Sequence, residues 1–172
     1  MRALVCLLLV LGAQATMVPS LSVEELVDQS EVIVHGRVAR SWTAWDGARK
    51  YIWTHHEIDI IDPIRGAGFA PVVVSEPGGA LDGVEMRFSG VLPYALGEEA
   101  VVFLYRTPVG YLRTQGHGQG KYTITSDARV RSNLRGVELL TRTSRGAPLS
   151  TFEDLPLMEF KARVRDTLRR PR

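Results

Sequence analysis

Short apolar runs, separated by glycine, proline and aspartate, make up most of the chain. In residues 32–38 the side chains of Val32, Val34 and Val38 fall on one face of an extended strand, a period of two that is typical of β-structure. Gly36 in the middle of this run predicts a bulge or a sharp bend. Further strands are predicted at residues 51–61, 71–75, 84–88, 100–105, 111–113 and 121–124. Many short strands with a turn every roughly 8–12 residues favour a barrel or a sandwich.

Three stretches add detail to this strand pattern. Residues 41–50 contain Asp46-Gly47 and predict a loop between the first two strands. Residues 100–105 are apolar at every position, which is typical of a central strand that is buried on both faces. Residues 126–148 have a weaker pattern and indicate one further hairpin. Because no linker or repeat interrupts the pattern, residues 16–172 are interpreted as a single domain.

Two helices are expected beside the strands. Ser22 and Glu25 have the spacing of a capping box, and Leu21 and Leu26 are placed for a hydrophobic staple, so a short helix begins here. An amphipathic helix is predicted over about 155–169, where apolar residues fall on one helical stripe. That stripe consists of Leu157, Phe160, Val164 and Leu168. Acidic residues early and basic residues late in this helix complement its dipole.

The first fifteen residues have the form of a signal peptide. Met1-Arg2 gives a positive start, residues 3–11 are an unbroken apolar run, and Ala13-Gln14-Ala15 has the small-x-small form of a cleavage site. The apolar run is far shorter than the roughly 20 residues that span a bilayer. We therefore expect cleavage near Ala15, a protein that is secreted or periplasmic, and no stable membrane anchor.

Composition and charge narrow the class of protein. The apolar fraction is 45% and the charged fraction 23%, which excludes a disordered chain. The single cysteine, Cys6, lies inside the predicted signal peptide, so no disulfide is expected within the domain. The net charge of +2 gives no reason to expect a nucleic-acid partner. The basic residues near the C-terminus are interpreted as the solvated end of the predicted helix.

The order of these signals resembles the module shared by tissue inhibitors of metalloproteinases and netrins. The matching segments are residues 30–38, 58–66, 72–74 and 97–104. The chain is also similar to exported bacterial proteins that have the same pattern. The resemblance implies an OB-like Greek-key barrel with flanking helices, so the expected fold class is mainly β. Inhibitors of that family place an N-terminal cysteine on the zinc of the protease. Thr16 would be the first residue here, so no inhibitory residue is carried over.

Histidine and carboxylate residues cluster in the second predicted strand. His55, His56, Glu57 and Asp59 have side chains of the type that bind zinc. In a strand, His55, Glu57 and Asp59 share one face while His56 points to the other. A metal site would need His55 with Glu57 or Asp59, together with a remote ligand such as His117 or His35. A polar outer face is the alternative interpretation, and we expect no bound metal.

Other chemistry-bearing patterns are incomplete. Residues 116–121 are rich in glycine and end in lysine, but Gln115 and Tyr122 stand where a phosphate-binding loop needs glycine and serine or threonine. The chain also lacks a Gly-x-Ser-x-Gly nucleophile motif. These observations predict neither a cofactor nor a nucleophilic enzyme.

Aromatic residues gather around the predicted loop at 41–50. Trp42 and Trp45 lie inside it, and Tyr51 and Trp53 follow. Exposed tryptophan and tyrosine side chains anchor protein interfaces and also stack on sugars. The leading hypothesis is a non-enzymatic exported module that binds a protein partner, such as a protease, through these four residues. A metal-dependent hydrolytic enzyme that uses His55, His56, Glu57 and His117 is one alternative. A cell-wall or carbohydrate-binding module is another, and the oligomeric state is left open.

Overall fold

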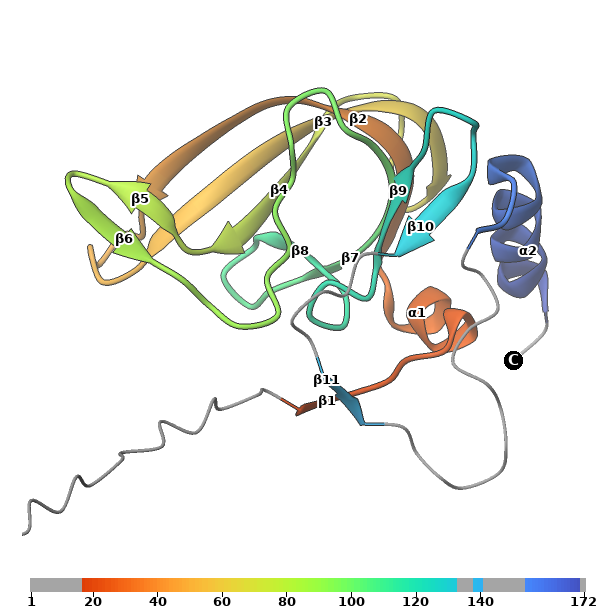
Figure 1. Cartoon of the computed structure of the whole chain (residues 1–172), viewed down its shortest axis with the longest axis horizontal. Coiled ribbons are helices and arrows are strands. Elements are labelled where there is room, and N and C mark those ends of the chain that lie inside the picture. The colour runs from red at the N-terminus through yellow and green to blue at the C-terminus, as the bar shows by residue number, and fades with distance from the viewer. Residues whose placement is uncertain (1–16, 133–137, 141–153, 171–172) are drawn as a thin grey trace, which may run out of the picture.

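The computed structural model describes residues 17–132, 138–140 and 154–170. Eleven strands and two helices are assigned in these residues (Figure 1). In chain order they are β1 (Met17–Pro19), α1 (Val23–Gln29), β2 (Val32–Trp45), β3 (Ile52–Arg65), β4 (Val72–Pro77), β5 (Gly79–Leu81), β6 (Val84–Met86), β7 (Glu99–Arg106), β8 (Leu112–Thr114), β9 (Lys121–Ile124), β10 (Val130–Ser132), β11 (Glu138–Leu140) and α2 (Leu157–Arg169). The mainly β fold class is confirmed.

Five of the strands close into a barrel. β2 pairs with β3, β3 with β4, β4 with β8, β8 with β7, and β7 with β2. Only the β4–β8 pairing in this ring is parallel. Numbered along the chain, the five strands follow each other as first, second, third, fifth and fourth, which is the order of an OB-like Greek-key barrel. The predicted OB-like barrel is therefore confirmed.

The central strand β7 separates two apolar clusters. Ala100, Val102 and Leu104 point into the barrel, where they pack with β2, β3 and β4. Val101 and Phe103 point outward to α1, α2 and Tyr122 of β9. The alternation along a strand places successive side chains on opposite faces. This arrangement explains why every position of residues 100–104 is both apolar and buried.

The two helices cover the outer face of β7. Ser22 caps α1 as predicted, because its hydroxyl accepts from the Glu25 backbone N–H and the Glu25 carboxylate accepts from the Ser22 N–H. Phe160 of α2 packs on Tyr122 at 4.8 Å between ring centroids and on Phe103 at 6.3 Å. The predicted C-terminal helix is confirmed. Neither helix of the described residues has the length and apolar character needed to cross a membrane.

Several predicted boundaries were wrong. The first half of the predicted loop at 41–50 is strand, because β2 continues to Trp45 and its residues 41–45 pair with β3. The turn itself is short, and it is held by the Asp46 carboxylate, which accepts from the backbone N–H groups of Lys50 and Tyr51. Trp42 and Trp45 are therefore strand residues.

The predicted second strand and the predicted late hairpin also needed correction. β3 does not end at Asp62-Pro63 but continues to Arg65, with a register shift next to the Val34–Pro63 pair. Proline is tolerated in strands at such irregularities. In the described part of 126–148, β10 and β11 do not pair with each other, since β10 pairs with β9 and β11 with β1. The predicted signal peptide, residues 1–15, lies outside the described residues.

Gly36 lies at the irregularity that the sequence predicted. The register of β2 on β3 shifts between His35 and Gly36. A Cβ atom at position 36 would lie 2.5 Å from the Asp59 carbonyl oxygen and 2.5 Å from the Ile58 Cγ2 atom. Both distances are far below van der Waals contact, so any side chain here forces the two strands apart.

We expect Gly36→Ala to lower the free energy of unfolding by about 1–3 kcal/mol, the usual effect of overpacking a core. Urea unfolding followed by tryptophan fluorescence measures this loss. Gly47→Ala is the matched control, because a Cβ at position 47 would meet no atom within 4 Å. Equal stability of the two variants would show that β2 and β3 can separate freely at Gly36.

Candidate binding surface

The β2–β3 hairpin divides the four predicted aromatic residues between its two faces. Trp42 lies opposite His55, and Ala44 lies opposite Trp53, so these side chains share one face. Trp45 lies opposite Ile52 on the other face. The sequence therefore grouped residues that the pleat of the sheet separates.

On the first face, the rings of Trp42, His55 and Trp53 form a continuous chain of contacts together with the ring of Tyr111. Trp42 stacks on His55 with 5.3 Å between centroids, His55 meets Tyr111 at 5.6 Å, and Tyr111 meets Trp53 at 4.8 Å. We call Trp42, His55, Tyr111 and Trp53 the aromatic row. Tyr111 comes from the connection between β7 and β8, far from β3 in sequence. No local signal connects it to the tryptophans, which is why sequence reasoning missed it.

An arginine lies at each end of the aromatic row. The guanidinium of Arg40 is 4.8 Å from the centre of the Trp42 ring, and that of Arg113 is 5.8 Å from the Trp53 ring. Both distances are within the range of cation–π attraction. Arg40 also donates two hydrogen bonds to the Glu57 carboxylate, at 3.0 and 2.8 Å. Because these contacts already exist, the row needs little ordering when a ligand binds.

His55 is fixed within the row by a hydrogen bond between its Nδ1 atom and the Ser75 hydroxyl, at 2.8 Å. Burial lowers the pKa of His55 below its ordinary value, so the ring is neutral at neutral pH. A hollow of about 390 Å³ adjoins His55 and Tyr111. Its other walls are Pro71, Val72, Val73, Ser75, Arg106, Gly110 and Leu112. This is the barrel face that OB-folds use for ligands, formed by the second and third barrel strands and the loop before the fifth.

Trp45 contacts the β5–β6 hairpin instead, and Tyr51 contacts the segment that follows it. The Trp45 indole N–H donates to the Asp82 carboxylate at 2.9 Å, and the Tyr51 ring meets Phe88 edge-on at 6.1 Å. The Thr43 hydroxyl donates to the Ala80 carbonyl on the same face. These contacts attach the β5–β6 hairpin to the tip of β2–β3. Trp45 therefore has a packing role in addition to any role in binding.

The histidine and carboxylate residues that were candidates for a metal site do not converge. His55 bonds to Ser75, while His56 points to the other face and bonds to the Ser41 hydroxyl at 2.7 Å. Glu57 is paired with Arg40, and His117 is an exposed residue that packs against Gly90. Within the described ranges no group of three or more His, Cys, Asp or Glu residues lies close enough to hold a metal ion.

His56 has the most perturbed histidine environment described here. The pKa of His56 is lowered to about 4, mainly by burial and in part by the charges of Lys121 and His55, while Glu98 acts in the opposite direction. A general base works best when its pKa is near the operating pH. The contact between Ser41 and His56 therefore lacks the basicity that would activate a serine nucleophile at neutral pH.

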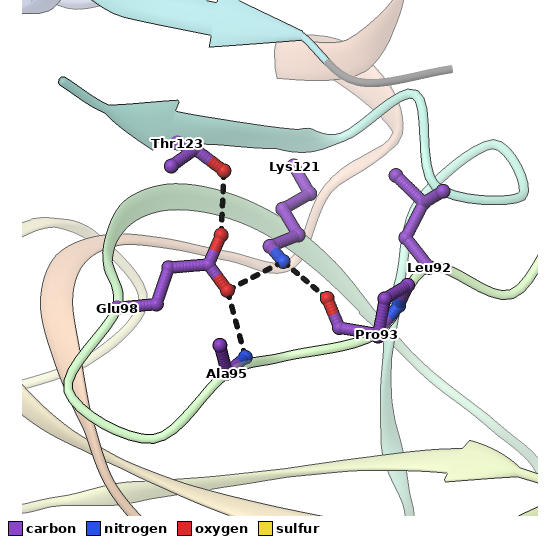
Figure 2. Close-up of a pocket in the computed structure, with 6 residues that line it drawn as sticks. All are labelled: Leu92, Pro93, Ala95, Glu98, Lys121 and Thr123. Carbon is purple, nitrogen blue, oxygen red and sulfur yellow. Dashed lines mark hydrogen bonds and ion pairs between the residues drawn. The ribbon is translucent and has the colours of Figure 1, made fainter. Parts of the chain in front are cut away.

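A buried ion pair near His56 was not predicted from the sequence (Figure 2). The Lys121 ammonium donates to the Glu98 carboxylate at 2.8 Å and to the Pro93 carbonyl, and it lies 4.3 Å from the centre of the Tyr94 ring. Glu98 also accepts from the Thr123 hydroxyl and the Ala95 N–H. Burial alone would raise the pKa of Glu98, but these hydrogen bonds lower it below its ordinary value. The pair thus attaches residues 93–98 to β9.

No protein-family model, curated protein or solved structure matches the chain. The resemblance to the metalloproteinase-inhibitor and netrin module therefore stays a prediction.

Proposed function

We propose that this chain is an exported, non-enzymatic binding module that engages a protein partner through the aromatic row. The observation that carries the proposal is the unbroken contact chain of Trp42, His55, Tyr111 and Trp53, with an arginine at each end. Tryptophan, tyrosine and arginine are the residues that most often dominate the energy of protein interfaces. The pattern of residues 1–15 supports export.

Charge and geometry favour a protein partner over a sugar or a nucleic acid. Arg40 and Arg113 are each paired with a carboxylate, Glu57 and Glu76, so the row offers little uncompensated positive charge to phosphates. Stacking on a sugar needs an open ring face, whereas the Trp42 ring already contacts both Arg40 and His55. The resemblance noted above makes proteases the first class of partner to test.

We expect Trp42→Ala to weaken binding to the partner by about 30-fold, because truncating a tryptophan that is a hot spot of an interface costs about 2 kcal/mol or more. Trp42 is 38% exposed, so its removal leaves the core intact. The measurement is the affinity of the immobilised protein for each of a panel of purified extracellular proteases. Partners captured by cross-linking from position 42 are measured in the same way.

Met158→Ala is the matched control, since Met158 is 70% exposed on α2, away from the barrel strands that form the row. Trp53→Ala tests the other end of the aromatic row. If Trp42→Ala and Trp53→Ala both stay folded by circular dichroism and bind every partner as tightly as the wild type, the aromatic row is not the interface.

A further inference from the structure

A groove lies on the opposite face of β3 from the aromatic row. It has a volume of about 540 Å³, within the range of about 300–1,000 Å³ that is usual for small-molecule sites. One wall consists of residues from β2, β3 and β4, and the other is the connection from β6 towards β7. The lining residues are Ser41, Thr54, His56, Glu76, Pro77, Gly78, Gly79, Met86, Arg87, Phe88, Val91, Leu92, Pro93 and Tyr94. We call this space the His56 groove.

The wall between β6 and β7 is largely apolar and is held in position. Met86, Phe88, Val91 and Leu92 contribute its side chains. Tyr94 also lines the groove, and its hydroxyl is hydrogen-bonded to the Thr114 hydroxyl at 2.6 Å. The ion pair described above fixes this wall to the barrel through the Pro93 carbonyl (Figure 2). The groove is therefore formed before any ligand arrives.

The charged residues that line the groove are already neutralised. The Glu76 carboxylate accepts from the Thr114 backbone N–H at 2.7 Å and from the Arg113 guanidinium. Arg87 is paired with Glu85 at 2.7 Å, and its side chain is 84% exposed, so its charge lies mainly in solvent. A charged ligand would lose its hydration on entering without meeting a free opposite charge.

One polar side chain of the groove keeps an unused hydrogen-bonding atom. His56 is only 5% exposed, and its Nδ1 atom bonds to Ser41 at 2.7 Å. Among the described residues, no hydrogen-bond partner is found for the Nε2 atom of His56. This atom is also not fully enclosed by the protein. The Nε2 atom therefore keeps some exposure, and His56 is one of the residues that line the groove. The ring is neutral at neutral pH because burial lowers its pKa to about 4.

We propose that the His56 groove binds a small uncharged molecule that is apolar over most of its surface and carries a single polar atom that hydrogen-bonds to His56. The apolar wall provides the binding energy, and the imidazole nitrogen orients the ligand. This site is separate from the aromatic row, because His55 and His56 are consecutive strand residues that point to opposite faces. It extends the proposed function by a second, small-molecule site.

The test uses N-phenyl-1-naphthylamine, an uncharged aromatic probe with one N–H group that fluoresces in apolar surroundings. We expect the wild-type protein to bind it, and we expect Val91→Trp, which fills the groove from its half-buried rim, to weaken binding at least tenfold. His56→Phe keeps a ring but removes the nitrogen, so it should also weaken binding. The sulfonated analogue 8-anilinonaphthalene-1-sulfonate should bind at least tenfold more weakly than the neutral probe.

Trp42→Ala is the matched control, because it alters the aromatic row and not the groove. Its affinity for the probe should equal that of the wild type. The imidazole resonances of His56 should shift on titration with the probe, which locates the site without any substitution. Absence of probe binding, equal affinity in Val91→Trp, or an unshifted His56 resonance would each overturn the proposal. None of these results depends on whether a protein partner binds the aromatic row.

Discussion

Lys121→Met is expected to lower the free energy of unfolding by about 3–5 kcal/mol, the usual cost of removing one partner from a buried ion pair. Lys121 is 5% exposed, and its ammonium is the cationic partner of Glu98. Methionine keeps most of the aliphatic length but leaves the Glu98 carboxylate buried with only the Thr123 and Ala95 donors. Urea unfolding at pH 7, followed by tryptophan fluorescence, measures the effect.

Two further variants separate the ion pair from simple packing. Lys50→Met is the control, because Lys50 is exposed and its ammonium lies only over the Tyr51 ring. Its stability should stay within about 0.5 kcal/mol of the wild type. Lys121→Met combined with Glu98→Leu should recover a large part of the loss, because the uncompensated charge is then removed. A single Lys121→Met variant as stable as Lys50→Met would mean that Glu98 finds its compensation elsewhere.

The parts of the fold that local patterns determine were predicted from the sequence. The capping box at Ser22 involves residues three apart, and the bulge at Gly36 follows from a glycine in mid-strand. Residues 100–105 were recognised as a central strand because both faces are apolar. In each case the interaction that determines the structure is encoded within a few residues.

The candidate site depends on contacts between distant residues, so Trp42, Trp53 and His55 were singled out from the sequence but Tyr111 was missed. The extension of β2 to Trp45 results from its pairing with β3, which overrides the loop signal of the polar residues around Asp46. Tyr111 joins the aromatic row only because the barrel brings the β7–β8 connection against β3. Lys121 and Glu98 are 23 residues apart and come together only when β9 pairs with β7.

Protonation of His56 should lower the free energy of unfolding as the pH falls below neutral, at a pH above that at which the carboxylates of the protein titrate. The folded-state pKa of His56 is about 4, below the ordinary 6.5, so the unfolded chain binds the proton more tightly. The contribution of neutral His56 to the free energy of unfolding is therefore fully present above about pH 6.5 and is lost as the pH drops towards 4. The loss should reach about 2 kcal/mol at pH 5 and about 3 kcal/mol below pH 4.

His56→Gln tests this assignment, because glutamine can bond to Ser41 but does not titrate. Between pH 7 and pH 5, its free energy of unfolding should lose most of the pH dependence of the wild type. A smaller slope of the same sign should remain, because burial also lowers the pKa of His55. Glu98 and Asp62, whose pKa values are lowered by cationic partners, lose their contributions only at lower pH. An unchanged slope in His56→Gln would show that His56 protonates as readily in the folded protein as in the unfolded chain.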